Sequence, residues 1–158
     1  MRRLAALLLV VTAALAVGGC ASGRVREANS YVAAVNRAQS AFSLASTRLA
    51  TSIGPDTAEN AHGEVDRRLT RYYAVVDRFV AQLRAIKPPS SVQTLHERLT
   101  AAVVSFGGSL RQAGADLTSG KAGRILDGQD RLGKATTAVA HAIDTTVAQI
   151  NSALKRDG

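Results

Sequence analysis

The residues of this chain whose types and spacing could do chemistry are few. The chain has 1 cysteine, Cys20, and 3 histidines. One histidine closes the run Glu59-Asn60-Ala61-His62, in which a carboxylate and an imidazole lie three residues apart. On a helix this spacing brings both side chains to one face, where they can share a metal ion. A cysteine thiolate is a nucleophile and a metal ligand. Metal binding and thiol modification are therefore the chemistries to weigh first.

Metal binding is weakly supported around Glu59 and His62. Di-iron bundles of the ferritin type use two Glu-x-x-His motifs and a glutamate from each of two further helices. This chain has one such motif, and its other glutamates, Glu27, Glu64 and Glu97, belong to no second one. A carboxylate at Glu59 is also favourable simply because it lies in the first turn of a helix. We therefore predict no di-iron centre.

The remaining histidines give no stronger lead. Counted from the Ser119-Gly120 turn, His96 and His141 fall at nearly the same height on adjacent helices, and their heptad phases predict that both face the surface. A third ligand is not visible, so we predict a solvated pair and not a metal site. A c-type haem needs a second cysteine, which this chain lacks. A haem with methionine and histidine ligands needs a methionine, and the single one, Met1, belongs to the expected signal peptide. The sequence predicts no cofactor, no metal site and no catalytic residues, and hence a protein that is not an enzyme.

The N-terminus has the form of a secretory signal. Met1-Arg2-Arg3 is basic, Leu4 to Val17 is apolar except for Thr12, and Gly18-Gly19 precede Cys20. A basic start, a short apolar core and small residues before a cut site are typical of a cleaved signal peptide. The apolar run is shorter than the roughly 20 residues that a membrane-spanning helix needs. A lone cysteine in an exported chain has no partner for an intramolecular disulfide.

Val17-Gly18-Gly19-Cys20 resembles the lipobox of bacterial lipoproteins. This resemblance implies cleavage before Cys20 and a diacylglycerol on its thiol. It divides the chain into a signal peptide (1–19), a lipidated N-terminus with a short linker (20–24) and a folded body (25–158). The expected location is the extracytoplasmic face of the cell membrane, to which the lipid on Cys20 anchors the protein. The alternative is an ordinary secreted protein with an incidental cysteine.

Four segments carry apolar residues at alternating steps of three and four, the spacing of helices that pack in coiled-coil fashion. Gly54-Pro55, Pro88-Pro89 and Ser119-Gly120 separate them. Short connections between long helices force antiparallel neighbours. We therefore predict an all-α, up-down-up-down antiparallel four-helix bundle. The apolar members of the stripes are Val25, Ala28, Val32, Val35, Phe42, Leu49 and Ile53; Ala58, Val65, Leu69, Tyr72, Val76, Phe79, Leu83 and Ile86; Val92, Leu95, Leu99, Ala102, Phe106, Leu110, Ala113 and Leu117; and Ile125, Leu132, Val139, Ile143, Ile150 and Ala153. Polar residues complete the alternation at Gln39, Ser46, His62, Gln129, Thr136 and Thr146.

Local signals refine this bundle. Ser90 and Gln93 fit a capping box at the start of the third helix. Glycines inside the third helix permit either close helix approach or a bend, and the glycine-rich stretch 120–133 predicts a frayed or bent start of the fourth helix. Tyr72 and Phe106 are predicted to lie level in a central layer, with Phe42 about one turn away and Leu132 near the same height. The layout of arginine- and alanine-rich helices also resembles uncharacterised helical lipoproteins of high-GC, actinobacterial-type bacteria, a resemblance that implies no activity.

The chain carries a formal net charge of +8, part of it from Arg2 and Arg3 in the signal. Such a balance favours anionic lipid head groups or acidic cell-wall polymers, or reflects a solvated basic surface. Nucleic acid is not expected, because no recognition motif is present. The sequence predicts a lipid-anchored bundle with a non-catalytic binding or envelope-associated role, whose partner is an envelope protein or an anionic cell-wall polymer. The alternative is a carrier of a metal ion or small ligand in a site within the bundle.

Overall fold

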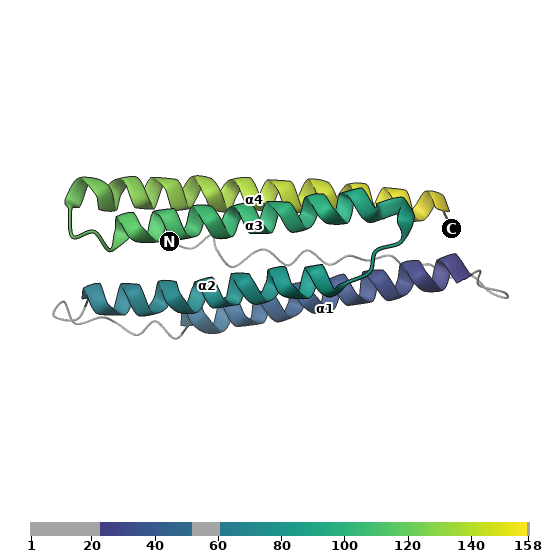
Figure 1. The fold of residues 1–158 in the computed structure, drawn as a ribbon, viewed down its shortest axis with the longest axis horizontal. Helices are drawn as coiled ribbons and strands as arrows, with labels where there is room; N and C mark the ends of the chain where they lie inside the picture. The colour runs from purple at the N-terminus through teal and green to yellow at the C-terminus, as the bar shows by residue number, and fades with distance from the viewer. Residues whose placement is uncertain (1–22, 52–60, 158) are drawn as a thin grey trace.

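The computed structural model describes residues 23–51 and 61–157, and these form four α-helices. Figure 1 shows α1 (Gly23–Thr51) beside α2 (Ala61–Ala85), and α3 (Gln93–Leu117) beside α4 (Ala122–Asp157). A short 3-10 helix, η2 (Ser90–Val92), precedes α3. Consecutive helices run in opposite directions, and no strand occurs in the described ranges. The predicted all-α, antiparallel four-helix arrangement is confirmed. The boundary predicted at Gly54-Pro55 lies outside the described residues.

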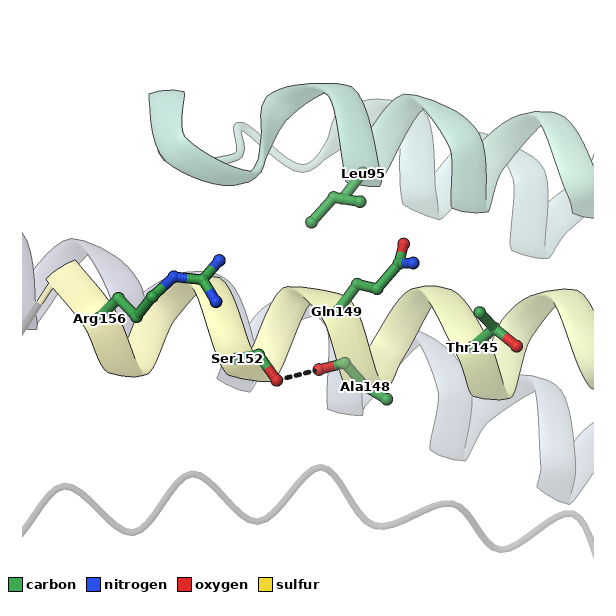
Figure 2. Close-up of a pocket in the computed structure, with 6 residues that line it drawn as sticks. All are labelled: Leu95, Thr145, Ala148, Gln149, Ser152 and Arg156. Atoms are coloured by element: carbon green, nitrogen blue, oxygen red, sulfur yellow. Dashed lines mark hydrogen bonds between the residues drawn. The ribbon is translucent and has the colours of Figure 1, made fainter.

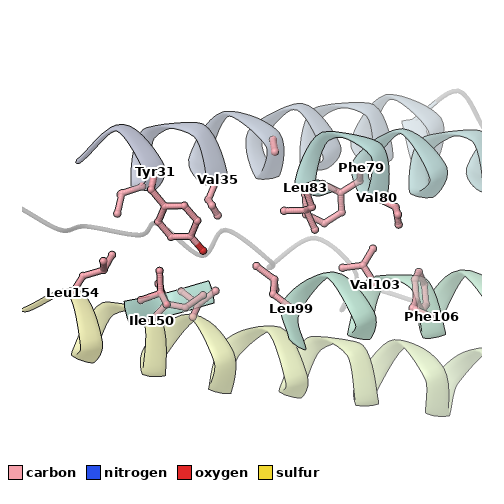
Figure 3. Packing of buried hydrophobic residues seen from close by; sticks show 14 of the residues in the cluster. Tyr31, Val35, Phe79, Val80, Leu83, Leu99, Val103, Phe106, Ile150 and Leu154 are labelled. Atoms are coloured by element: carbon pink, nitrogen blue, oxygen red, sulfur yellow. The ribbon is translucent and has the colours of Figure 1, made fainter. Parts of the chain in front are cut away.

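The apolar core is concentrated in the half of the bundle next to the α2–α3 connection. Figure 3 shows side chains from all four helices meeting there. The side chains of Leu83 and Val92 are fully buried, at 0% exposure. Removing large aliphatic side chains from water is the main stabilising contribution to such a bundle. The buried apolar residues are Ala28, Tyr31, Val32, Val35 and Ala38 of α1, Val76, Phe79, Val80 and Leu83 of α2, Val92, Leu99, Val103, Phe106, Leu110 and Ala113 of η2 and α3, and Val147, Ile150, Ala153 and Leu154 of α4.

The central aromatic layer is confirmed in one of its contacts and wrong in another. The rings of Tyr72 and Phe106 meet edge to face, with centroids 6.4 Å apart. Phe42 does not join them, because it stacks on Phe79 at 4.7 Å, seven residues further along α2. Leu132 is half-buried against the core. Helix α1 is therefore shifted along α2 by about one turn relative to the predicted register.

The connection between α2 and α3 differs from the predicted capping box. Ser90 lies in η2, and the cap position of α3 is Val92, which makes no side-chain cap hydrogen bond. Gln93 donates instead to Oε1 of Glu97 at 3.1 Å. The capping box is wrong because the 3-10 turn already begins at Ser90, with the amide of Val92 donating to the carbonyl of Pro89 at 3.0 Å. Burial of Val92 holds this turn against the core.

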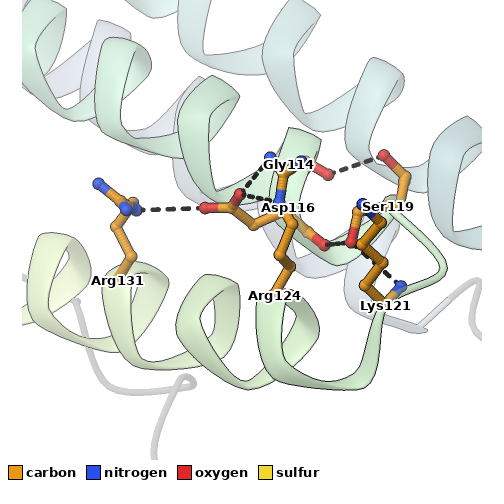
Figure 4. A network of polar contacts seen from close by, with 7 residues as sticks. Gly114, Asp116, Ser119, Lys121, Arg124 and Arg131 are labelled. Atoms are coloured by element: carbon orange, nitrogen blue, oxygen red, sulfur yellow. Dashed lines mark hydrogen bonds and ion pairs between the residues drawn. The ribbon is translucent and has the colours of Figure 1, made fainter.

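The connection between α3 and α4 is a tight turn at Gly120, whose φ of +69° is readily adopted only by glycine. Asp116 of α3 ties the turn to α4: its Oδ1 accepts from Nη2 of Arg124 at 2.7 Å, and its Oδ2 pairs with Nε of Arg131 at 3.5 Å (Figure 4). Helix α4 then continues unbroken to Asp157. The predicted fraying or bending across residues 120–133 is wrong.

The reason is close helix packing at a glycine. A Cβ placed at Gly128 would lie 2.9 Å from the carbonyl oxygen of Ala113 and 3.0 Å from Cβ of Asp116. Glycine at this position therefore lets α4 approach α3 more closely than any other residue would allow. On α3, Gly114 allows a similarly close approach to α2, because the ring of Tyr73 occupies the space that a Cβ would need. Gly128 and Gly114 therefore serve close approach, which the sequence left open, whereas a Cβ at Gly108, Gly123 or Gly133 would meet nothing within 4 Å.

Candidate functional site

The sequence candidates differ in how far the structure describes them. Cys20 and Glu59 lie outside the described residues, and His62 lies in the first turn of α2 without a described side chain. Helix α1 begins at Gly23, three residues after Cys20. His141 is exposed on α4, as predicted. His96 is not: it is only 5% exposed, and its predicted surface position is wrong.

His96 joins three helices through its two ring nitrogens. Its Nε2 lies 3.0 Å from the carbonyl oxygen of Leu83 in the last turn of α2, and its Nδ1 lies 3.2 Å from the hydroxyl of Tyr31 on α1. A carbonyl oxygen only accepts, so Nε2 carries a proton and donates to Leu83; in the tautomer with its single proton on Nε2, Nδ1 accepts from the hydroxyl of Tyr31. The neutral tautomer therefore satisfies every polar atom of the contact.

The environment of this contact is apolar. Tyr31 is 3% exposed, and burial raises the pKa of its hydroxyl from 10.0 to about 12. The two rings meet edge to face at 5.6 Å. Both nitrogens of His96 and the hydroxyl of Tyr31 are occupied by partners within the bundle, so this contact orders the helices and leaves no group directed at a ligand.

The spacing of the buried residues along η2 and α3 includes His96. Apart from Gly107 and Gly114, the buried residues of η2 and α3 are Val92, His96, Leu99, Val103, Phe106, Leu110 and Ala113, and these follow an unbroken alternation of four and three. The predicted stripe instead took Leu95 and Ala102, which are only half-buried. His96 occupies a seam position of the bundle. The surface assignment followed from a stripe drawn through Leu95, one residue before His96, which put His96 just off the predicted seam.

A shallow pocket of about 610 Å³ lies between the start of α3 and the last turns of α4 (Figure 2). Leu95 supplies the α3 side, and Thr145, Ala148, Gln149, Ser152 and Arg156 line the α4 side. Oε1 of Gln149 accepts from Nη1 of Arg98 at 3.2 Å, and the hydroxyl of Ser152 donates to the carbonyl of Ala148 at 2.9 Å. Gln149 and Ser152 therefore engage these groups within the protein and do not direct them at a ligand.

Within the described residues, no three carboxylate, histidine or cysteine side chains gather where they could hold a metal ion. Of the four described helices, none combines the length and the apolar character needed to cross a bilayer. Comparison of the whole chain with protein-family models, with curated proteins and with solved structures finds no match.

Proposed function

We propose that this protein is a lipid-anchored helical bundle on the extracytoplasmic face of a bacterial cell membrane, with a non-catalytic binding or envelope-associated role. The observation that carries the proposal is the position of Cys20. It follows a lipobox-like Val17-Gly18-Gly19 and precedes the first residue of α1, Gly23, by three residues. Three residues span at most about 10 Å, so a lipid on Cys20 would hold the bundle against the bilayer.

The contacts inside the bundle favour a non-catalytic role. The buried histidine, His96, has both nitrogens occupied by Tyr31 and Leu83. The side chains of Gln149 and Ser152 in the pocket are likewise bonded to other parts of the protein. A carrier of a metal ion or small ligand, the second candidate, would need polar groups that are free to meet its cargo. We therefore rank it below an interaction module whose partner is an envelope protein or an anionic cell-wall polymer.

The experiment is replacement of Cys20 by alanine in the full chain, expressed in a bacterium that processes lipoproteins. The wild-type protein should fractionate with membranes, and its N-terminal peptide should carry the mass of a diacylglycerol. The Cys20→Ala variant should remain uncleaved or be released. Ser22→Ala is the matched control, because it changes a neighbouring small residue and leaves the thiol in place. A wild-type protein with a free Cys20 thiol and no acyl chain would refute the anchor.

A further inference from the structure

One end of the bundle gathers unpaired positive charge. The start of α1 and the end of α4 lie at this end, and the end of α2 with the following loop lies in the same half of the bundle, short of the start of α1 (Figure 1). Six exposed cations occupy these three segments, and we call them the basic end: Arg24, Arg26, Arg84, Lys87, Lys155 and Arg156.

None of these six side chains takes part in an ion pair or hydrogen bond within the described part of the chain. Arg98, exposed near the start of α3, bonds only to the neutral Gln149. Away from this end, six cations are paired: Arg67 and Arg68 with Glu64, Arg111 with Asp77, Arg124 and Arg131 with Asp116, and Lys134 with Asp130. The other exposed cations there, Arg37, Arg71, Arg78 and Lys121, make no ion pair within the described residues, but they are spread along the helices and do not gather at one place. The acidic residues near the basic end are Glu27, Glu97 and Asp157. Positive charge therefore exceeds negative charge there.

Helix stability does not account for all of these cations. Arg84, Lys155 and Arg156 lie in the last turns of α2 and α4, where the helix dipole favours positive charge. Arg24 and Arg26 lie at the start of α1, where the dipole disfavours it, and the first turn of α1 contains no acidic residue. Lys87 follows α2 and belongs to no helix. An external anion would compensate the charges of Arg24, Arg26 and Lys87.

We propose that the basic end docks on the head groups of anionic phospholipids, so that the bundle stands end-on upon the membrane. The inference rests on the proposed function, which supplies the lipid on Cys20 as a tether. Helix α1 starts three residues after Cys20, and the first turn of α1 belongs to the basic end. A lipid on Cys20 would bring these cations within the Debye length of about 8 Å over which an anionic surface attracts them. Cell-wall polymers are also anionic, but they are not fixed next to Cys20.

The experiment reports which end of the bundle faces the bilayer. Ala85 and Ala122 are exposed helix-terminal residues near opposite ends of the bundle, separated by the length of α3, roughly 40 Å. The protein purified from membranes is prepared as Ala85→Cys or Ala122→Cys and labelled with a fluorophore. Each form is then reconstituted into phosphatidylcholine vesicles with or without phosphatidylglycerol, which contain an acceptor on their head groups. End-on docking predicts several-fold stronger energy transfer from position 85 than from position 122. The ratio of the two transfer efficiencies should decrease clearly in vesicles without phosphatidylglycerol.

The charge variants test which cations are responsible. Arg26→Gln with Lys87→Gln removes two cations of the basic end, and Arg71→Gln with Lys121→Gln removes two exposed cations away from it, one in the middle of α2 and one before α4. At roughly fivefold in affinity for each cation near an anionic surface, the first pair should weaken the end-on preference about 25-fold. The second pair should leave it unchanged.

Three outcomes would overturn the proposal: equal transfer from positions 85 and 122, a ratio that does not depend on phosphatidylglycerol, or equal effects of the two variant pairs. Release of the basic end by soluble poly(glycerol phosphate), at equal phosphate concentration, would assign it to a cell-wall polymer instead. Failure of the tether is seen separately, because a free Cys20 thiol would take up the label in the unsubstituted protein. The same comparison is then made in a Cys20→Ser background, where the preference for anionic vesicles still decides the role of the basic end.

Discussion

The hydroxyl of Tyr31 on α1 lies 3.2 Å from Nδ1 of His96 on α3, and the opposite ring nitrogen of His96 contacts the carbonyl oxygen of Leu83 at 3.0 Å. These contacts fix three helices at the height where the apolar core is densest. Because a buried polar atom without a partner costs more free energy than a satisfied one gains, the contact constrains how the helices can pack. It is a structural device in the seam of the bundle.

Replacing Tyr31 by phenylalanine should lower the free energy of unfolding by about 1 kcal/mol at pH 7, because Nδ1 of His96 loses its donor. The measurement is chemical denaturation of the purified wild-type and variant proteins. An unchanged or raised stability would show that the hydroxyl contributes nothing through His96.

The same hydroxyl predicts a dependence of stability on alkaline pH. Its pKa is raised by burial from 10.0 to about 12, so the folded state holds the proton more tightly than the unfolded state. This contribution is complete below pH 10 and is lost as the pH rises through 12, by at most about 2–3 kcal/mol. Tyr31→Phe should lack this component, so its stability should fall less steeply than that of wild type between pH 10 and 12. Parallel curves for the two proteins would contradict the burial of the hydroxyl.

The glycines of α4 offer a matched pair of substitutions. Gly128→Ala should destabilise the protein by about 1–3 kcal/mol, because the added methyl group meets the backbone of α3 at Ala113. Gly133→Ala, on the same helix, meets nothing within 4 Å and should stabilise the protein by up to about 1 kcal/mol through helix propensity. Thermal unfolding of both variants gives the comparison. Similar effects of the two substitutions would show that Gly128 does not govern the approach of α4 to α3.

The fold could be predicted from the sequence because it depends on spacing, and much of the packing could not because it depends on neighbours. The stripe through Val76, Phe79 and Leu83 and the turn at Gly120 follow from apolar periodicity and from glycine chemistry. That Gly128 would meet Ala113 depends on the distance between two helices, which a single sequence does not contain.

The candidate site shows the same division. His96 lies at an unbroken seam spacing, so its burial was open to prediction, but its partners were not. They are a main-chain carbonyl at the end of α2 and a hydroxyl that comes from α1, 65 residues away in the chain. Lipidation of Cys20 is predicted from a local motif. The described residues begin at Gly23, so this lipidation stays a prediction.

Truncating Phe106 to alanine should cost about 3–5 kcal/mol of stability, because its side chain is only 6% exposed and packs edge to face on Tyr72. Val104→Ala on the same helix is the control, since Val104 is 43% exposed and should change stability by less than about 0.5 kcal/mol. Urea denaturation of both variants measures the difference. A loss below roughly 1 kcal/mol for Phe106→Ala would mean that the α3 face is wrongly assigned.

Removal of metal ions should leave the fold intact. A structural zinc site needs four ligands in tetrahedral geometry, and the carboxylates and histidines of the described residues do not gather even in threes. The imidazole of His96 is held by Tyr31 and Leu83 and is not free to ligate. The thermal midpoint of the purified protein should therefore be the same, within about 2 °C, with and without a strong chelator. Glu59→Gln with His62→Gln provides the control for the remaining Glu-x-x-His pair, and this variant should unfold at the wild-type midpoint. A larger fall of the thermal midpoint on chelation, reversed by one added metal and absent in that variant, would favour the function of a metal-ion carrier.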